Sequence, residues 1–156
     1  MSIELDINRC FEEVGMQTIH GTAVELKNRA VLIIGNTGSG KSSLALRLLA
    51  LGCNLVADDR VSAFVSEDRV LLRAPKGLPA GIEIRGVGIA NVPLVSEASL
   101  ALVVDLNKAE SQRMPYLVDR KIDIKGISVP LFDFQDIKDP ASAIYIMLKH
   151  GLANLN

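Results

Sequence analysis

The stretch Ala30–Gly52, "AVLIIGNTGSGKSSLALRLLALG", decides the fold. Its first part, Ala30–Ile34, is continuously apolar, which predicts a strand buried on both faces near the middle of a sheet. Three leucines, Leu44, Leu48 and Leu51, then recur at helical spacing and predict a helix with one apolar face. A buried strand that enters a helix through a glycine-rich loop indicates an α/β domain that binds phosphate.

The loop itself, "GNTGSGKS", fits the pattern G-x-x-x-x-G-K-[ST] in full. Its glycines let successive backbone N–H groups point at phosphate oxygens, and the helix that follows adds its positive N-terminal end. Lys41 supplies a positive charge for the β- and γ-phosphates, and the Ser42 hydroxyl can bind Mg²⁺. The expected nucleotide-binding residues are Gly35, Asn36, Thr37, Gly38, Ser39, Gly40, Lys41 and Ser42.

Length, charge and cysteine content narrow the class of protein. The 156 residues suit one domain, for which we expect a short N-terminal extension over 1–17 and a single domain over 18–156. With 17 basic and 18 acidic residues and no basic run, a nucleic-acid partner is not expected. No signal-peptide core or membrane-spanning run is visible. Cys10 and Cys53 lack the spacing of a metal site, so we expect free thiols in a reducing compartment. Together with the missing membrane-spanning run, this predicts a cytoplasmic location and no membrane partner.

The remaining elements follow from apolar patterning. We expect strands at 22–26, within 54–65, at 69–74, at 82–89 and at 99–106, a loop followed by a strand over 114–134, and a helix at 140–150. The alternation in "IEIRGVGI" predicts that Glu83 and Arg85 share one face of a strand.

Phosphoryl transfer also needs an acid, and two strand ends offer one. Asp58 and Asp59 follow one apolar strand and Asp105 ends another, so either strand resembles a Walker B strand. If the first strand continues through the aspartates, their side chains point to opposite faces; if it ends there, both can lie at the site. A turn that favours aspartate explains the pair equally well. Spacing alone therefore leaves the roles of these acids, of Glu83 and of His20 open.

Four blocks occur in order: "HGTAVEL" at 20–26, "GNTGSGKS" at 35–42, "LVADDRV" at 55–61 and "IEIRGVGIANV" at 82–92. Together they resemble the catalytic domain of the HPr kinase/phosphorylase family in its short alphaproteobacterial form, over about residues 18–150. The resemblance implies a P-loop α/β fold similar to the nucleotide domain of phosphoenolpyruvate carboxykinase. It also implies ATP and Mg²⁺ as cofactors, a homo-hexamer, and phosphorylation of a serine on HPr or an HPr-like phosphocarrier of the phosphotransferase system.

The same resemblance assigns roles to single residues. The implied catalytic residues are Asp58, Asp59, His20 and Lys41, and the implied magnesium ligands are Ser42 and Glu83. One of the two aspartates takes the proton of the substrate serine; we prefer Asp58, and we expect His20 beside it. Asp105 then lies outside the chemistry.

The chain departs from the family pattern at two places. Ser43 stands where the family usually has an acid, and "FQDIKDPASA" at 134–143 lacks the arginine of the family's Pro-Gly-Arg-Asn segment, with Lys138 as the nearest cation. Lysine cannot reproduce a bidentate arginine contact. The resemblance therefore does not carry over the reverse phosphorylase activity. Two alternatives stay open: a nucleotide-binding regulatory module with little catalysis, and a small-molecule kinase that uses Asp105.

Overall fold

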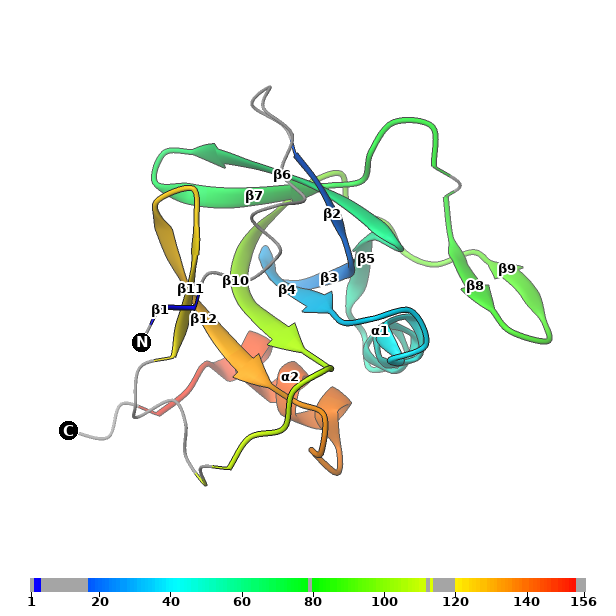
Figure 1. Cartoon of the computed structure of the whole chain (residues 1–156). Coiled ribbons are helices and arrows are strands. Elements are labelled where there is room, and N and C mark those ends of the chain that lie inside the picture. Colours follow the sequence, from blue (N-terminus) through cyan, green and yellow to red (C-terminus); the bar gives the residue numbers. More distant parts are fainter. Residues whose placement is uncertain (1, 4–16, 79, 112, 114–119, 154–156) are drawn as a thin grey trace.

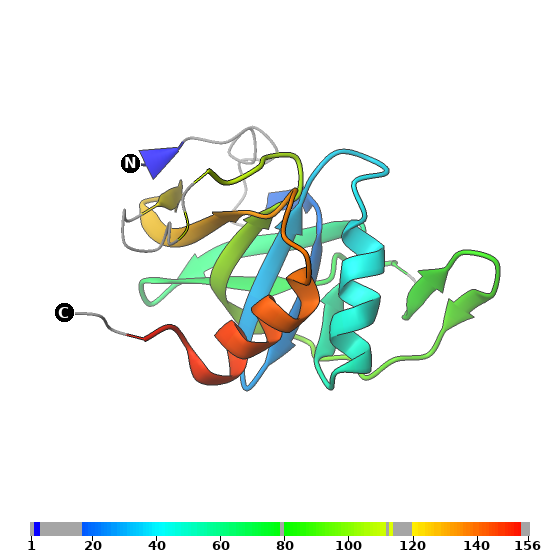
Figure 2. The ribbon, with the colours of Figure 1, turned by 90° about the horizontal axis from the view of Figure 1, so that it is seen from below.

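The computed structural model describes residues 2–3, 17–78, 80–111, 113 and 120–153. They form a curved sheet with both helices packed on the same face, and a separate small hairpin extends to one side (Figures 1 and 2). The helices are α1 (Lys41–Ala50) and α2 (Pro140–His150). The strands are β1 (Ser2–Ile3), β2 (Gln17–His20), β3 (Thr22–Leu26), β4 (Arg29–Ile34), β5 (Asn54–Ala57), β6 (Arg60–Ser66), β7 (Arg69–Arg73), β8 (Ile82–Ile84), β9 (Gly88–Ala90), β10 (Ala98–Asp105), β11 (Lys121–Ile124) and β12 (Ile127–Asp133).

Strand β4 lies in the middle of the main sheet, as its apolar sequence predicts. The order is β1-β11-β12-β10-β4-β3-β5, with β10 parallel to both β4 and β12 and β3 antiparallel to β4. Strands β2, β6 and β7 extend the sheet from the start of β10. The turn between β3 and β4 places Lys27 and Asn28 at φ 54° and 62°, the left-handed pair that a two-residue hairpin requires.

The core has two parts, one on each side of the sheet. On one side, Leu44 and Leu48 of α1 and Ile144 of α2 pack against the sheet, and all three are buried. On the other side, strands β2, β6 and β7 cover residues such as Leu32 of β4. The central strand is therefore buried on both faces, which confirms the mixed α/β class and the predicted packing of the helix after the loop.

The segment "IEIRGVGI" is a hairpin and not one strand, so the prediction that Glu83 and Arg85 share a strand face is wrong. Glu83 lies in β8, whereas Arg85 lies in the turn that leads to β9. The amide of Val87 donates to the carbonyl of Ile84 (2.9 Å), and Gly86 takes φ 85°. A glycine at the third position of a turn permits this conformation, which the apolar alternation did not reveal.

Two further segments also split. The chain at 54–65 breaks at Asp58 and Asp59 into β5 and β6, so the first strand ends at the acidic pair. Strands β11 and β12 form a hairpin across Lys125 and Gly126, where one strand was expected. Cys53 is a buried free thiol, whereas Cys10 lies outside the described residues, as does most of the expected 1–17 extension. In the part of the chain that the structure describes, no helix is long and apolar enough to cross a membrane.

Candidate active site

The glycine-rich loop connects the end of β4 to the first turn of α1. Gly40 caps the helix in the left-handed conformation (φ 99°), and Gly38 is also left-handed (φ 84°). No side chain caps this helix end and no acidic residue occupies its first turn. The helix N-terminus therefore offers its free N–H groups and positive dipole end to an anion.

Lys41 is held inside this loop. Its Nζ donates hydrogen bonds to the carbonyl oxygens of Gly35 (2.8 Å) and Asn36 (3.1 Å), and the residue is only 8% exposed. The ammonium group thus lies on the inner side of the loop, where its charge can reach phosphate oxygens bound to the loop N–H groups. Lys41 therefore adds a positive charge to the loop.

A second set of contacts holds the start of the loop from outside. The amide of Asn36 donates to Oδ1 of Asn107 (2.9 Å), and the amide of Asn107 donates to Oδ1 of Asp105 (2.8 Å). Asp105 lies at the end of β10, next to Ile34 on β4, and is 4% exposed. Asp105 and Asn107 thus support the loop. Asn107 was not predicted from the sequence, although the side chain of an aspartate commonly accepts a hydrogen bond from the backbone N–H two residues further along.

Asp58 lies directly beside the loop. Its Oδ1 accepts hydrogen bonds from the hydroxyls of Ser42 and Thr22, both at 2.9 Å. Thr22 is completely buried at the start of β3, and sequence analysis did not single it out. Within the described residues, Oδ2 of Asp58 has no hydrogen-bond partner. Two hydroxyls therefore orient this carboxylate and leave one oxygen available for chemistry.

Asp59 forms a separate pair with His20. The imidazole Nε2 lies 3.0 Å from Oδ1 of Asp59, and the two side chains are 49% and 70% exposed. The pairing of β2 with β6, which sets His20 opposite Arg60, brings these distant residues together. Asp59 takes φ 69°, a conformation that aspartate tolerates better than most residues. His20 therefore contacts Asp59, and Ser42 contacts Asp58.

Glu83 faces the same cavity as the two aspartates. This cavity, about 480 Å³ in volume, is lined by Asp58, Asp59 and Glu83 together with apolar side chains. Glu83 itself is exposed on the β8–β9 hairpin, which extends away from the main sheet (Figure 1). The cavity therefore brings three carboxylates together, and Asp58 connects it to the phosphate loop through Ser42.

The oxygen atoms at this edge fit Mg²⁺ delivered with a nucleotide. Ser42 donates its hydroxyl proton to Asp58, so the oxygen lone pairs are free to bind a cation. Among the described residues, no cluster of three His, Cys, Asp or Glu side chains forms a complete metal cage. Mg²⁺ commonly binds through one or two protein oxygens plus phosphates and water, so the Ser42 hydroxyl oxygen suits this ion.

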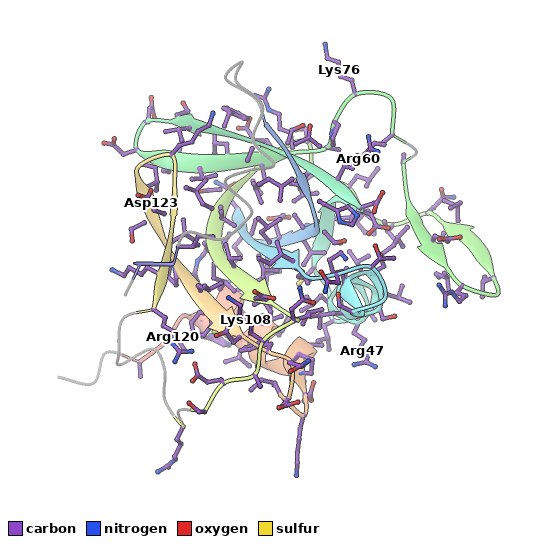
Figure 3. All side chains as sticks on the ribbon, in the orientation of Figure 1. Arg47, Arg60, Lys76, Lys108, Arg120 and Asp123 are labelled. Atoms are coloured by element: carbon purple, nitrogen blue, oxygen red, sulfur yellow. The ribbon has the colours of Figure 1, made fainter. Side chains whose placement is uncertain are left out.

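A second acidic pair, Asp105 and Asp133, lies at the ends of the neighbouring strands β10 and β12. Asp133 ends β12 opposite Asp105, and Arg120 (Figure 3) donates to its Oδ2 at 3.2 Å. The other oxygen of Asp133 is buried without a partner. Burial, and next the charge of Asp105, raise the pKa of Asp133 above its usual value despite the opposing effect of Arg120.

Comparisons with known proteins give one consistent family. The family model described as "HPr Serine kinase C-terminal domain" matches residues 14–135. An HPr kinase/phosphorylase from Thermoanaerobacter sp. is 32% identical over 94% of this chain and 49% of that protein, and one from Lactobacillus johnsonii is 48% identical over 49% of this chain and 24% of that protein. The structure of the Hpr(Ser) kinase/phosphatase from Coxiella burnetii superposes with a TM-score of 0.72 at 29% identity, covering 85% of this chain and 94% of that one. The chain spans about half the length, or less, of the curated relatives it matches.

Proposed function

The chain belongs to the family of HPr serine kinase C-terminal domains, and on this basis we propose that it is an ATP-dependent kinase that phosphorylates a serine of HPr or of an HPr-like phosphocarrier. The observation that carries the proposal is the position of Asp58. Its carboxylate is hydrogen-bonded to Ser42 of the phosphate loop and faces the open cavity that also contains Glu83. A base must be oriented and close to the transferred phosphoryl group, and Asp58 meets both conditions.

In the proposed mechanism the loop amides and Lys41 bind the β- and γ-phosphates of ATP and balance their charge. Asp58 accepts the proton of the incoming serine hydroxyl through Oδ2, because Thr22 and Ser42 hold the carboxylate by Oδ1. Ser42 and Glu83 would hold Mg²⁺, which supplies charge neutralisation at the phosphates.

We assign Asp59 and His20 a role next to the base. Asp59 lines the cavity beside Asp58 and is paired with His20, and both paired side chains are exposed, so they can pass a proton between Asp58 and solvent. A hydrogen-bonded carboxylate and imidazole suit such a transfer. In this proposal Asp58 accepts the proton of the serine hydroxyl, and Asp59 with His20 then transfers it to solvent.

The position of Asp105 weighs against a small-molecule kinase that uses this residue as its metal-linked acid. Asp105 is buried and supports Asn107, which in turn holds the loop.

We do not propose the phosphorylase reaction, since the chain lacks the arginine of the family's Pro-Gly-Arg-Asn segment. We further propose a cytoplasmic location. We also propose a homo-hexamer, and light scattering of the pure protein would test this oligomeric state.

The test is incubation of the protein with labelled ATP, Mg²⁺ and HPr from the same source. We expect label on a serine of HPr, lost in Asp58→Asn and kept in Asp68→Asn. Asp68 is a suitable control because it is an exposed aspartate in the β6–β7 turn with positive φ, where asparagine is equally tolerated. ATP binding without transfer to HPr would favour the regulatory module, and full activity in Asp58→Asn would refute the assigned base.

A further inference from the structure

The two aspartates that end β10 and β12, Asp105 and Asp133, are buried next to each other. The two strands are parallel and pair these residues in register, which places their Cα atoms roughly 5 Å apart. Val103 and Leu131, two positions earlier, are also partners and pack in the part of the core that β2, β6 and β7 cover. Because side chains alternate along a strand, both aspartates point to that same face of the sheet. They are only 4% and 7% exposed.

The charged groups around this pair do not balance. Arg120 donates through one nitrogen both to Glu110 and to Oδ2 of Asp133, and the Glu110 side chain is itself buried. Lys108 is the other cation of the described residues whose charge acts on Asp133, and both cations lie at this end of the sheet (Figure 3). Three carboxyl groups, including Asp105, therefore face two cations. If all three were ionised, the group would have one negative charge in excess.

An oxygen without a partner indicates how this charge is compensated. Oδ1 of Asp133 is buried and has no hydrogen-bond partner within the described ranges. A buried carboxylate oxygen without a partner costs free energy, and two adjacent buried carboxylates disfavour being ionised together. A proton on this oxygen removes the excess charge and supplies a hydrogen-bond donor beside Asp105. The pKa of Asp133, raised first by burial and then by the charge of Asp105, agrees with a bound proton.

The pair is connected to the phosphate loop by a short series of hydrogen bonds. Oδ1 of Asp105 accepts from the amide of Asn107 (2.8 Å), and Oδ1 of Asn107 accepts from the amide of Asn36 in the loop (2.9 Å). The place of Asn107 therefore depends on the orientation of Asp105. An ionised Asp133 would repel Asp105, whereas a proton between the two carboxyl groups holds Asp105 in position.

We propose that Asp105 and Asp133 share one proton, and that this protonated pair positions the phosphate loop for ATP through Asn107. Both aspartates are positioning residues, because they act on the loop and not on ATP itself. The proton is bound below the pKa of the folded pair and is lost above it, so the affinity for ATP falls as the pH rises. This inference rests on the ATP-binding part of the proposed function.

The experiment measures the affinity of MgATP by calorimetry between about pH 5 and pH 9, in the wild type and in Asp133→Asn. Asparagine replaces the protonated carboxyl group by an amide of the same shape that donates a hydrogen bond and does not titrate. We expect equal affinities at the acid end. At the alkaline end the wild type should bind about fivefold more weakly than the variant, the equivalent of one lost hydrogen bond. The ratio of the two dissociation constants cancels the titration of ATP itself.

Asp123→Asn is the matched control. Asp123 is exposed on β11, away from Arg120 in Figure 3, and accepts from the amide of Gly126, which an asparagine oxygen also does. This variant should keep the wild-type pH profile. Asp105→Asn should show the same flat profile as Asp133→Asn, because one proton serves both carboxyl groups.

Three results would overturn the shared proton. The first is a wild-type to Asp133→Asn ratio that stays constant with pH. The second is an Asp133→Asn protein that does not fold, since the amide reproduces the protonated carboxyl group. The third is a wild-type affinity that changes with the monovalent cation at fixed pH and no longer does so in Asp133→Asn, since a cation would then occupy the place of the proton.

Phosphorylation of HPr by the same samples separates this inference from the kinase assignment. Absence of phosphorylation with the expected affinity ratios would refute the kinase reaction and leave the shared proton standing. Normal phosphorylation with a ratio that does not change with pH would refute the shared proton and leave the kinase reaction standing. Absence of ATP binding in both proteins would refute both.

Discussion

The hydroxyl of Thr22 offers the sharpest test of how the site is built. Thr22 is completely buried, and its hydroxyl is one of two groups that orient Asp58. Thr22→Val replaces the hydroxyl by a methyl group of similar size and removes this hydrogen bond, together with the longer one that the Asp59 amide donates to the same hydroxyl (3.5 Å). Thr22→Ser keeps the hydroxyl and removes only the buried methyl group. The two variants thus separate the orientation of Asp58 from the packing of β3.

Both variants should lower the free energy of unfolding, and Thr22→Val should lower it more. Thr22→Val loses a hydrogen bond to a carboxylate, worth about 1.5–3 kcal/mol, although Ser42 still donates to the same oxygen. Thr22→Ser loses one buried methyl group and leaves a small cavity, which costs about 0.5–1.5 kcal/mol. For a domain of this size we expect the melting temperature to fall by roughly 3–12 °C in Thr22→Val and by roughly 1–6 °C in Thr22→Ser.

Catalysis should respond to only one of them. In Thr22→Val, Asp58 is held by Ser42 alone and can turn away from the substrate hydroxyl, so we expect kcat to fall by about ten- to a hundredfold, within the range ascribed to a positioned base. The KM for ATP should change little, because the loop and Lys41 are untouched. Thr22→Ser should keep a kcat near that of the wild type.

The assay is steady-state phosphorylation of HPr at saturating ATP, with melting followed by circular dichroism on the same samples. A wild-type kcat in Thr22→Val would refute the argument that Thr22 orients the base. An equal loss of kcat in Thr22→Ser would show that packing of β3, and not the hydrogen bond, controls the site.

Three further changes test other parts of the structure. Asn107→Ala removes the acceptor that holds the Asn36 amide and should raise the KM for ATP by about fivefold, the equivalent of about 1 kcal/mol; an unchanged KM would mean that the loop keeps its shape unaided. Arg29 donates to the carbonyls of the last turn of α2, so Arg29→Met should lower the melting temperature by about 2–4 °C with unchanged kcat, and a loss of activity would contradict this purely structural role. The raised pKa of Asp133 means that the folded protein binds this proton more tightly than the unfolded chain, so stability falls as pH rises through the folded pKa. Urea unfolding between pH 4 and 7 should show this fall in the wild type and a flatter profile in Asp133→Asn, and identical profiles would refute the shift.

The phosphate loop and its two flanking elements could be predicted from the sequence because they are contiguous. Strand β4, the octet at 35–42 and helix α1 follow one another along the chain, and each has a local signal: continuous apolar residues, glycines, and leucines at helical spacing. The burial of β4 on both faces follows from the same composition. The turns at Gly86 and Gly126 were missed, since apolar alternation continues across a tight hairpin.

The contacts that make the site were decided only by the tertiary structure. Thr22 meets Asp58 across 36 positions of sequence, His20 meets Asp59 across 39, and Asn36 meets Asn107 across 71. Each contact depends on which strands pair and in which register, and one residue of slippage would turn every side chain of a strand to the opposite face. Local patterns do not encode that register; it is set when the two apolar faces of the sheet are buried together. The sequence by itself therefore determined that the chain has a phosphate loop, and the paired sheet determined which carboxylate stands beside it.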